Sequence, residues 1–292
     1  VSGSVEIKNG ADVTVNAGDY GISGATGVVI DNAKVNAVGE KYCGINSAQA
    51  VEIKNKSVVD AKGMTPGITG MTGVIINGAT VNAVSTASNG VFSGGNVAIG
   101  NGADVNANGK NPGIYSDTGV IISGSVVKAE STDGNGICSN GILEIVENAD
   151  VTVIANGNYA AVYGHGGVSI SGAKRVYVEA MNSHGIFSDG NVQIANSKDV
   201  AVKCSYIGIR GYDGVSIAGS VVNATSSDDT GIYSPQNIEI KNGADVTAKG
   251  YSGGISSDNA DVIISSSKVS ADSTQDEYNG AGISAAEGKV DI

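Results

Sequence analysis

The stretch GIYSDTGVIISGSVVKAESTDGN, residues 113–135, decides the fold, because its features recur along the whole chain. It opens on a Gly-Ile pair, and the next such pair, Gly136-Ile137, follows after 23 residues. A repeat of this length is typical of solenoid proteins, in which stacked units bury a shared core. The pair, or a near relative of it, begins at residues 21, 44, 67, 90, 113, 136, 161, 185, 208, 231, 254 and 282.

Each unit contains three short segments in which apolar residues alternate with others. After the Gly-Ile pair come two triplets, for example Val120-Ile121-Ile122 and Val127-Lys128-Ala129. Turn dipeptides such as Ser-Gly and Asn-Gly separate the segments, and none has helical periodicity. In a strand the two ends of a triplet face inward and its middle residue faces outward. The repeat therefore predicts an all-β, right-handed parallel β-helix of about 12 coils of roughly 23 residues, with three strands per coil.

A finer alternation has a period of two coils. The spacing from the second to the third segment alternates between 8 and 7 residues, as in Val51 to Val59 and Val74 to Val81. The outward residue of the second segment alternates between acidic and aliphatic, as in Glu52 and Ile75. This places like charges about 9.6 Å apart and limits their repulsion. A ribbed surface that binds a partner is the alternative interpretation.

The composition limits the partners and the chemistry. The chain is 41% apolar with 44 Gly and 3 Pro, which suits a large core with many tight corners. Its formal charge of −12 disfavours nucleic acid and anionic lipid as partners. No apolar run approaches the ~20 residues of a membrane span, so membrane insertion is not expected. Three separated cysteines form neither a disulfide framework nor a zinc motif, and Cys138 is expected to face outward as an easily labelled thiol.

We expect residues 1–292 to form one β-solenoid domain. The sequence opens on Val5-Glu6-Ile7 and closes on Val290-Asp291-Ile292, and both triplets belong to the middle of a coil. Uncovered strand edges invite pairing with other chains. The expected native protein is therefore a longer surface protein whose caps or further coils lie outside this sequence.

The residue after each Gly-Ile pair should face outward and form a row along the solenoid. Both phenylalanines of the chain fall in this row. Six steps of about 4.8 Å make its central part roughly 29 Å long. That part consists of Phe92, Tyr115, Cys138, Tyr163, Phe187, Arg210 and Tyr233, and the column two residues further on adds Asp117, Asn140, His165, Asp189 and Tyr212.

Aromatic rings flanked by polar side chains suit a sugar chain, because pyranose rings pack on aromatic faces while the polar groups bind hydroxyls. The alternative is an external stacking ladder that only stiffens the sheet. The predicted ligand-binding residues are Phe92, Tyr115, Asp117, Tyr163, His165, Phe187, Asp189, Arg210, Tyr212 and Tyr233.

Signals for catalysis or metal binding are weak. The sequence has no GxSxG, HExxH, P-loop or EF-hand pattern. Asp189 and Asp213 lie on successive coils with Arg210 nearby and make a minimal lyase-like group, although an ordinary surface ion pair is the simpler interpretation. Asp117 lies about 14 Å from Asp189, too far to share a Ca²⁺ ion. We therefore predict no catalytic residue and no metal ligand.

Residues 113–145 and 185–202 carry the pattern Gly-Ile-x-Ser, followed by alternating apolar residues. This pattern resembles that of secreted clostridial carbohydrate-binding β-helix proteins, whose architecture is that of pectate lyases. The resemblance implies an extracellular or cell-surface bacterial protein that binds plant or host polysaccharide, sometimes with Ca²⁺. This chain departs from the pattern in having few acidic residues on the first strand's outer face, which bears on any Ca²⁺ site.

Three functions follow from these observations. The leading expectation is a non-catalytic extracellular module for polysaccharide binding or adhesion, which uses the row from Phe92 to Tyr233. The second is a structural stalk or adhesin repeat without a glycan ligand. The third is a polysaccharide lyase or hydrolase that uses Asp189, Asp213 and Arg210.

Overall fold

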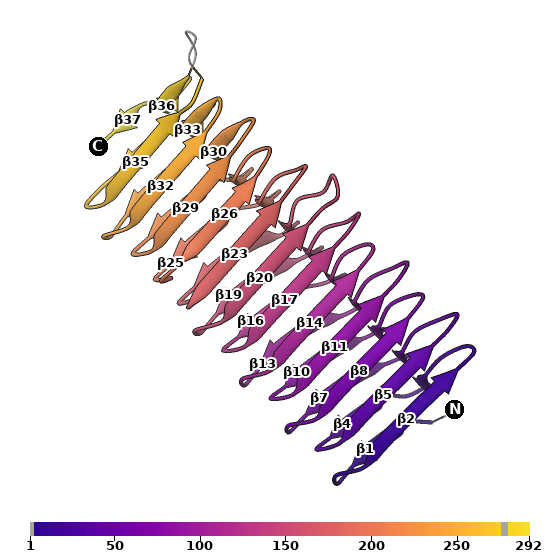
Figure 1. The fold of residues 1–292 in the computed structure, drawn as a ribbon. Coiled ribbons are helices and arrows are strands. Elements are labelled where there is room, and N and C mark those ends of the chain that lie inside the picture. The colour runs from indigo at the N-terminus through magenta and orange to yellow at the C-terminus, as the bar shows by residue number, and fades with distance from the viewer. Residues whose placement is uncertain (1–2, 276–279) are drawn as a thin grey trace.

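The computed structural model describes residues 3–275 and 280–292, which form one continuous stack of coils (Figure 1). Every regular element among these residues is a β-strand, and each pairs in parallel with strands three places away in the chain. In Figure 1 the front strands point to the upper right while the coils advance to the upper left, which is right-handed winding. The predicted parallel β-solenoid of about 12 coils with three strands per coil is confirmed.

Sheet A contains the second segment of each repeat and has 13 strands. Its register joins residues one repeat apart, so that Val120 lies beside Leu143 and Ile122 beside Ile145. Its strands are β1 (Val5–Lys8), β4 (Val28–Asp31), β7 (Ala50–Lys54), β10 (Gly73–Asn77), β13 (Asn96–Gly100), β16 (Val120–Ser123), β19 (Ile142–Val146), β22 (Gly167–Ser171), β25 (Val192–Ala195), β28 (Val215–Ala218), β31 (Ile238–Lys241), β34 (Val262–Ile264) and β37 (Val290–Asp291).

Sheet B contains the third segment and has 12 strands, most of them six residues long. Small inner residues such as Ala107 and Ala129 pair along it and are fully buried. Its strands are β2 (Asp12–Ala17), β5 (Lys34–Gly39), β8 (Val58–Gly63), β11 (Thr80–Ser85), β14 (Asp104–Gly109), β17 (Val126–Ser131), β20 (Asp150–Ala155), β23 (Arg175–Ala180), β26 (Val200–Cys204), β29 (Val221–Ser226), β32 (Asp245–Gly250) and β35 (Lys268–Ser273).

Sheet C begins at the Gly-Ile pairs and has 12 short strands. The glycine allows a close approach to sheet B: a Cβ atom on Gly113 would lie 2.8 Å from the backbone of both Ala107 and Glu130. Its strands are β3 (Ile22–Gly24), β6 (Ile45–Ser47), β9 (Ile68–Gly70), β12 (Val91–Ser93), β15 (Ile114–Ser116), β18 (Ile137–Ser139), β21 (Val162–Gly164), β24 (Ile186–Ser188), β27 (Ile209–Gly211), β30 (Thr230–Ser234), β33 (Gly253–Ser257) and β36 (Ala281–Ala285).

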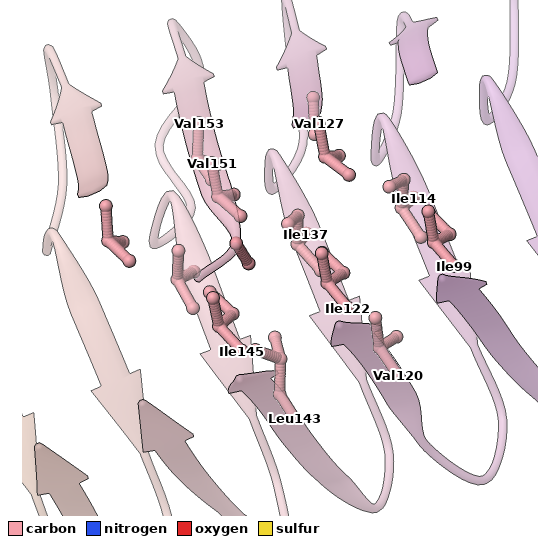
Figure 2. Close-up of a cluster of buried hydrophobic side chains, with 14 of the residues drawn as sticks. Ile99, Ile114, Val120, Ile122, Val127, Ile137, Leu143, Ile145, Val151 and Val153 are labelled. Carbon is pink, nitrogen blue, oxygen red and sulfur yellow. The ribbon is translucent and has the colours of Figure 1, made fainter. Parts of the chain in front are cut away.

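The core is a set of aliphatic columns that run along the solenoid (Figure 2). Ile114 and Ile137 are direct neighbours on sheet C, and both are fully buried. They meet the inner columns of sheet A, such as Ile122 and Ile145, across the interior (Figure 2). Each such side chain contributes roughly 1.5–3 kcal/mol through burial. The alternation of inward and outward residues is thus the main stabilising pattern.

The corner between sheets A and B explains the alternating spacing of 8 and 7 residues. The longer corner of coil 5 has two residues in the left-handed conformation, Asn101 and Gly102, with φ of 56° and 74°. The shorter corner of the next coil has one, Gly124, with φ of 54°. Asn and Gly adopt this conformation more readily than other residues. The extra residue therefore lies in the turn and leaves the strand register unchanged.

Buried serines close the corner between sheets C and A. The hydroxyl of Ser116 donates to the carbonyl of Gly95 at 2.7 Å and accepts from the amide of Gly119 at 3.0 Å. These bonds satisfy polar backbone groups in the partly buried turn. The sequence pattern contained this Ser but did not reveal its role. The fully buried members of the column are Ser47, Ser93, Ser116, Ser139, Ser188, Ser234 and Ser257.

The outer face of sheet A carries the predicted alternation of acidic and aliphatic residues. Glu52 pairs with Lys54 on its own strand at 2.8 Å, and Ile75 on the next strand is 41% exposed. The register places Ile75 directly beside Glu52. Glu6, Glu52 and Glu239 are each paired with the lysine two residues further along the strand, and no two glutamates of this column are direct neighbours. This agrees with charge management on a solvated sheet.

The inner and outer isoleucines should respond differently to truncation. We expect Ile137→Ala to lower the free energy of unfolding by about 2–5 kcal/mol, because it leaves a cavity in the core column. Ile121→Ala should cost less than about 1 kcal/mol, because Ile121 faces outward and is 36% exposed. Urea denaturation followed by circular dichroism measures both. Equal losses would contradict the inside-outside assignment.

Candidate functional site

The outward row on sheet C is continuous. The strand register joins Phe92 to Tyr115, Tyr115 to Cys138, and Cys138 to Tyr163. It continues from Tyr163 through Phe187 and Arg210 to Tyr233. These seven residues, called the sheet C row below, come from strands β12, β15, β18, β21, β24, β27 and β30.

Rings on adjacent coils stack against one another. The ring centroids of Phe92 and Tyr115 lie 5.5 Å apart, and the angle between the ring planes is 8°. The ring centroids of Tyr163 and Phe187 also lie 5.5 Å apart, with an interplanar angle of 14°. Stacking along the solenoid axis turns the ring edges toward solvent and covers the faces between the paired rings. The aromatic members of the row are therefore partly buried, and their stacking has the geometry of the external ladder that the sequence left open as an alternative.

Cys138 corrects one sequence-based expectation. It lies in the outward row, yet only 7% of it is exposed, since it is the smallest member and stands between two tyrosines. Burial, with a smaller effect from the Asp117 charge, raises the pKa of its thiol to about 11. A buried thiol that stays protonated at neutral pH reacts slowly. The prediction that Cys138 is an exposed, easily labelled thiol is therefore wrong.

The first polar cluster surrounds the Tyr115 hydroxyl. Tyr115 donates to Oδ1 of Asp117 at 2.9 Å, and the side-chain amide of Asn140 donates to the Tyr115 hydroxyl at 2.9 Å. Asn140 also reaches Asp117 Oδ1 at 3.3 Å. Burial and the bond to Asp117 raise the pKa of Tyr115. The hydroxyl is thereby fixed as a protonated donor, and the ring is held upright.

The second polar cluster lies two coils further on. The Tyr163 hydroxyl donates to Asp189 Oδ2 at 2.5 Å, and Nδ1 of His165 lies 2.6 Å from the same oxygen. Burial, then the bond to Asp189, raises the pKa of Tyr163 well above its usual value. Asp189 thus orients both a ring and an exposed imidazole. This brings together three of the predicted binding residues.

Arg210 lies among aromatic rings. Its guanidinium carbon is 5.3 Å from the Phe187 centroid, 4.6 Å from that of Tyr212 and 5.4 Å from that of Tyr233. These are cation–π distances. Within residues 3–275 and 280–292 no carboxylate oxygen lies within 4.0 Å of this guanidinium, so neither Asp189 nor Asp213 pairs with it. Asp189, Asp213 and Arg210, the lyase-like group considered from the sequence, therefore do not form an ion-paired cluster in the structure.

Two contributors were missed by sequence reasoning. Asp258 accepts a hydrogen bond from the Tyr233 hydroxyl, and together with burial this raises the pKa of Tyr233 to about 12. Burial is the larger cause. Asp258 stands four residues after Gly254, as Asp117 stands after Gly113, so the same offset would have found it. The other contributor is His184, which stacks on Phe187 with centroids 5.4 Å apart.

No group of three or more His, Cys, Asp or Glu side chains suited to hold a metal ion occurs in the described part of the chain. Asp117 and Asp189 are engaged in separate clusters on different coils. The residues present do not make the carboxylate cage that Ca²⁺ prefers. Among residues 3–275 and 280–292 there is also no helix long and apolar enough to cross a membrane.

His184 should make stability depend on pH. Burial, followed by the Arg210 charge, lowers its pKa, although Asp229 opposes this, and its Nδ1 accepts from the Ile207 amide at 3.2 Å. Because the folded pKa lies below the unfolded value of about 6.5, stability is complete above that pH and falls as the pH drops below it.

The midpoint of thermal unfolding should therefore fall between about pH 7 and pH 5.5. His184→Gln should reduce this fall, because it removes the partly buried imidazole that must gain a proton. Thermal unfolding at the two pH values tests this. An unchanged dependence in His184→Gln would assign the effect to other groups.

Comparisons with protein-family models, with curated proteins and with solved structures found no match to this chain. The site is therefore interpreted from its own geometry.

Proposed function

We propose that this chain is a non-catalytic extracellular module that binds polysaccharide on the outer face of sheet C. The observation that carries the proposal is the sheet C row itself, in which aromatic residues and Arg210 occupy six of seven consecutive coils, with Cys138 on the remaining one, beside hydrogen-bonding side chains. Carbohydrate sites combine aromatic surface with a few polar groups that fix the hydroxyls.

The polar side chains along the row are suited to hydroxyl groups. Asp117, Asn140 and His165 are exposed, and Asp189 is partly exposed. Each already takes part in a hydrogen bond that fixes its orientation. Side chains held in place before binding lose less conformational freedom when a ligand arrives. A sugar would therefore meet an ordered array of donors and acceptors.

A cell-surface or secreted bacterial location is part of this proposal. It is supported by the resemblance of the repeat to clostridial carbohydrate-binding solenoids and by the formal charge of −12, which suits a soluble surface. The proposed partner is a plant or host polysaccharide. Nucleic acid and anionic membranes are unsuitable partners, because the negative charge of the chain repels them.

A structural stalk remains the second candidate, because one observation favours it. The rings of Phe92 and Tyr115, and those of Tyr163 and Phe187, pack on each other. Such pairs stabilise a sheet by about 0.5–1.5 kcal/mol each without any ligand.

Truncation of two rings separates the two functions. Tyr115→Ala combined with Tyr163→Ala removes one ring from each stacked pair and both fixed hydroxyls. If the chain binds glycan on this face, affinity on a glycan array or an affinity gel should fall at least about tenfold, equivalent to 1.4 kcal/mol.

The control is Tyr20→Ala combined with Tyr42→Ala, which removes a stacked pair elsewhere, with centroids 4.8 Å apart. It should keep binding. Lower stability in the Tyr115 and Tyr163 variant, with no glycan bound by the wild type, would instead identify a stalk.

The third candidate, a polysaccharide lyase or hydrolase, is tested by product release. Uronic-acid polymers incubated with the wild type, with and without Ca²⁺, should yield no unsaturated or reducing ends if the module is non-catalytic. Release that disappears in Asp189→Asn would establish an enzyme in place of a binding module.

A further inference from the structure

Arg210 is the cation of the sheet C row, and within residues 3–275 and 280–292 it has no anionic partner. The chain has one other arginine, Arg175 on sheet B. Arg175 donates from Nε to Asp150 at 2.8 Å and from Nη2 to Thr152 at 3.1 Å. The two arginines therefore differ, because the protein neutralises Arg175 and leaves the charge of Arg210 without a counterion.

Aromatic rings from three coils hold the guanidinium of Arg210 in place. Phe187 lies on the preceding sheet C strand and Tyr233 on the following one, with ring centroids 5.3 Å and 5.4 Å from the guanidinium carbon. Tyr212, from the same coil as Arg210, lies closer, at 4.6 Å. These contacts attract the positive charge but supply no carboxylate or carbonyl oxygen to its N–H groups. The guanidinium is therefore positioned while its hydrogen-bonding capacity is unused.

The donors of Arg210 divide into one covered nitrogen and two open ones. Nε is buried and has no acceptor in the part of the chain that the structure describes. Nη1 and Nη2 form no hydrogen bond with those residues either, but they are not buried and can be reached from solvent. The planar pair of Nη groups matches the two oxygens of a carboxylate. The open edge of Arg210 is therefore suited to an anion supplied from outside.

The surroundings of Arg210 strengthen an ion pair formed there. Arg210, Phe187 and Tyr233 are partly buried, and Tyr212 is 43% exposed. Charges attract each other more strongly where apolar side chains replace part of the surrounding water. A side chain that is held in place before binding also loses less conformational freedom when the ligand arrives.

Acidic side chains on both sides limit the charge of the ligand. Asp189 follows the sheet C strand one coil before Arg210, and Asp258 follows the strand two coils after it. The whole chain carries a formal charge of −12. A polymer with a carboxylate on every sugar would therefore be repelled, whereas one isolated carboxylate meets the guanidinium alone.

We infer that Arg210 binds the carboxylate of a single acidic sugar in an otherwise neutral glycan. The rings of Tyr212 and Tyr233 beside the guanidinium offer apolar contact to the same sugar. This inference rests on the proposed glycan-binding function and names the class of glycan that the sheet C row selects.

Oligosaccharides that differ only in the terminal sugar test the inference. One ends in a neutral hexose and the other in the corresponding hexuronic acid. On an array, the wild type should bind the uronic-acid member at least about tenfold more tightly than the neutral member. Arg210→Gln should abolish this preference, and Arg210→Lys should retain part of it, because lysine keeps the charge but lacks the planar pair of donors.

The control variant is Arg175→Gln, which removes the arginine that is already paired with Asp150 on sheet B. It should keep the full preference for the uronic-acid member. Thermal unfolding of each variant shows whether it is folded at the temperature of the array.

Two further glycans define the anion and the number of charges. The neutral oligosaccharide with a sulfate ester on its terminal sugar should bind more weakly than the uronic-acid member. Polygalacturonate should also bind more weakly at physiological salt. Tighter binding of the sulfate ester would overturn the carboxylate as the ligand, and tighter binding of polygalacturonate would overturn the preference for a single acid.

The outcomes distinguish this inference from the proposed function. Equal binding of the neutral and uronic-acid members by the wild type would overturn the role of Arg210 and leave sheet C as a glycan site. The same conclusion would follow if Arg210→Gln kept the preference. Absence of binding by the wild type to every glycan would overturn both proposals.

Should the Arg210 variants fail to fold, chemical modification of the wild type decides. Phenylglyoxal modifies arginine, and mass spectrometry follows Arg210 with Arg175 as the internal reference. The uronic-acid oligosaccharide, at about twice its dissociation constant, should slow modification of Arg210 about threefold and leave Arg175 unchanged. Equal protection of Arg210 by the neutral oligosaccharide at that concentration would overturn the inference.

Discussion

The parallel hydrogen-bonded stacking of like strands is the constraint on which everything else depends. Each residue pairs with the one a full repeat away, so that side chains 23 positions apart in sequence lie about 4.8 Å apart in space. This converts a weak periodic signal into continuous columns. The same operation that stacks Ile114 on Ile137 in the core stacks Phe92 beside Tyr115 outside. The same strand register therefore positions both the buried core columns and the outer row of the candidate site.

The sequence was sufficient for the fold because each repeat carries its own register marks. The Gly-Ile pair fixes the start of each sheet C strand, and the alternating triplets fix which side chains are buried. The alternation between 8 and 7 residues from the second to the third segment could also be read from the sequence. Its cause, one additional left-handed residue such as Gly102 in the longer corner, became clear only from the backbone conformation. The recurring serines could be seen in the sequence, but their role could not be predicted from it. Their hydroxyls bond to backbone groups of the turn, and the repeat pattern does not give the orientation of those groups.

The candidate site was predictable as a row and unpredictable in its details. Period 2 assigns a side chain to the outside but does not fix its torsion angles, so the choice between exposed ring faces and stacked rings was open. Cys138 is covered because its neighbours are larger, a relation between columns that a single position does not reveal. The Arg210 guanidinium likewise packs on aromatic rings and forms no ion pair with Asp189. The Asp189 carboxylate instead interacts with Tyr163 and His165.

Rigidity and recognition are linked on this face. The ring pairs that stiffen sheet C also hold Tyr115 and Tyr163 upright on either side of Cys138. Removing a ring therefore weakens the sheet and the candidate binding surface together, and the stability of a truncated variant has to be measured beside its binding. A solenoid is well suited to this comparison, since each coil contacts only its neighbours and a change in one rung leaves distant rungs intact.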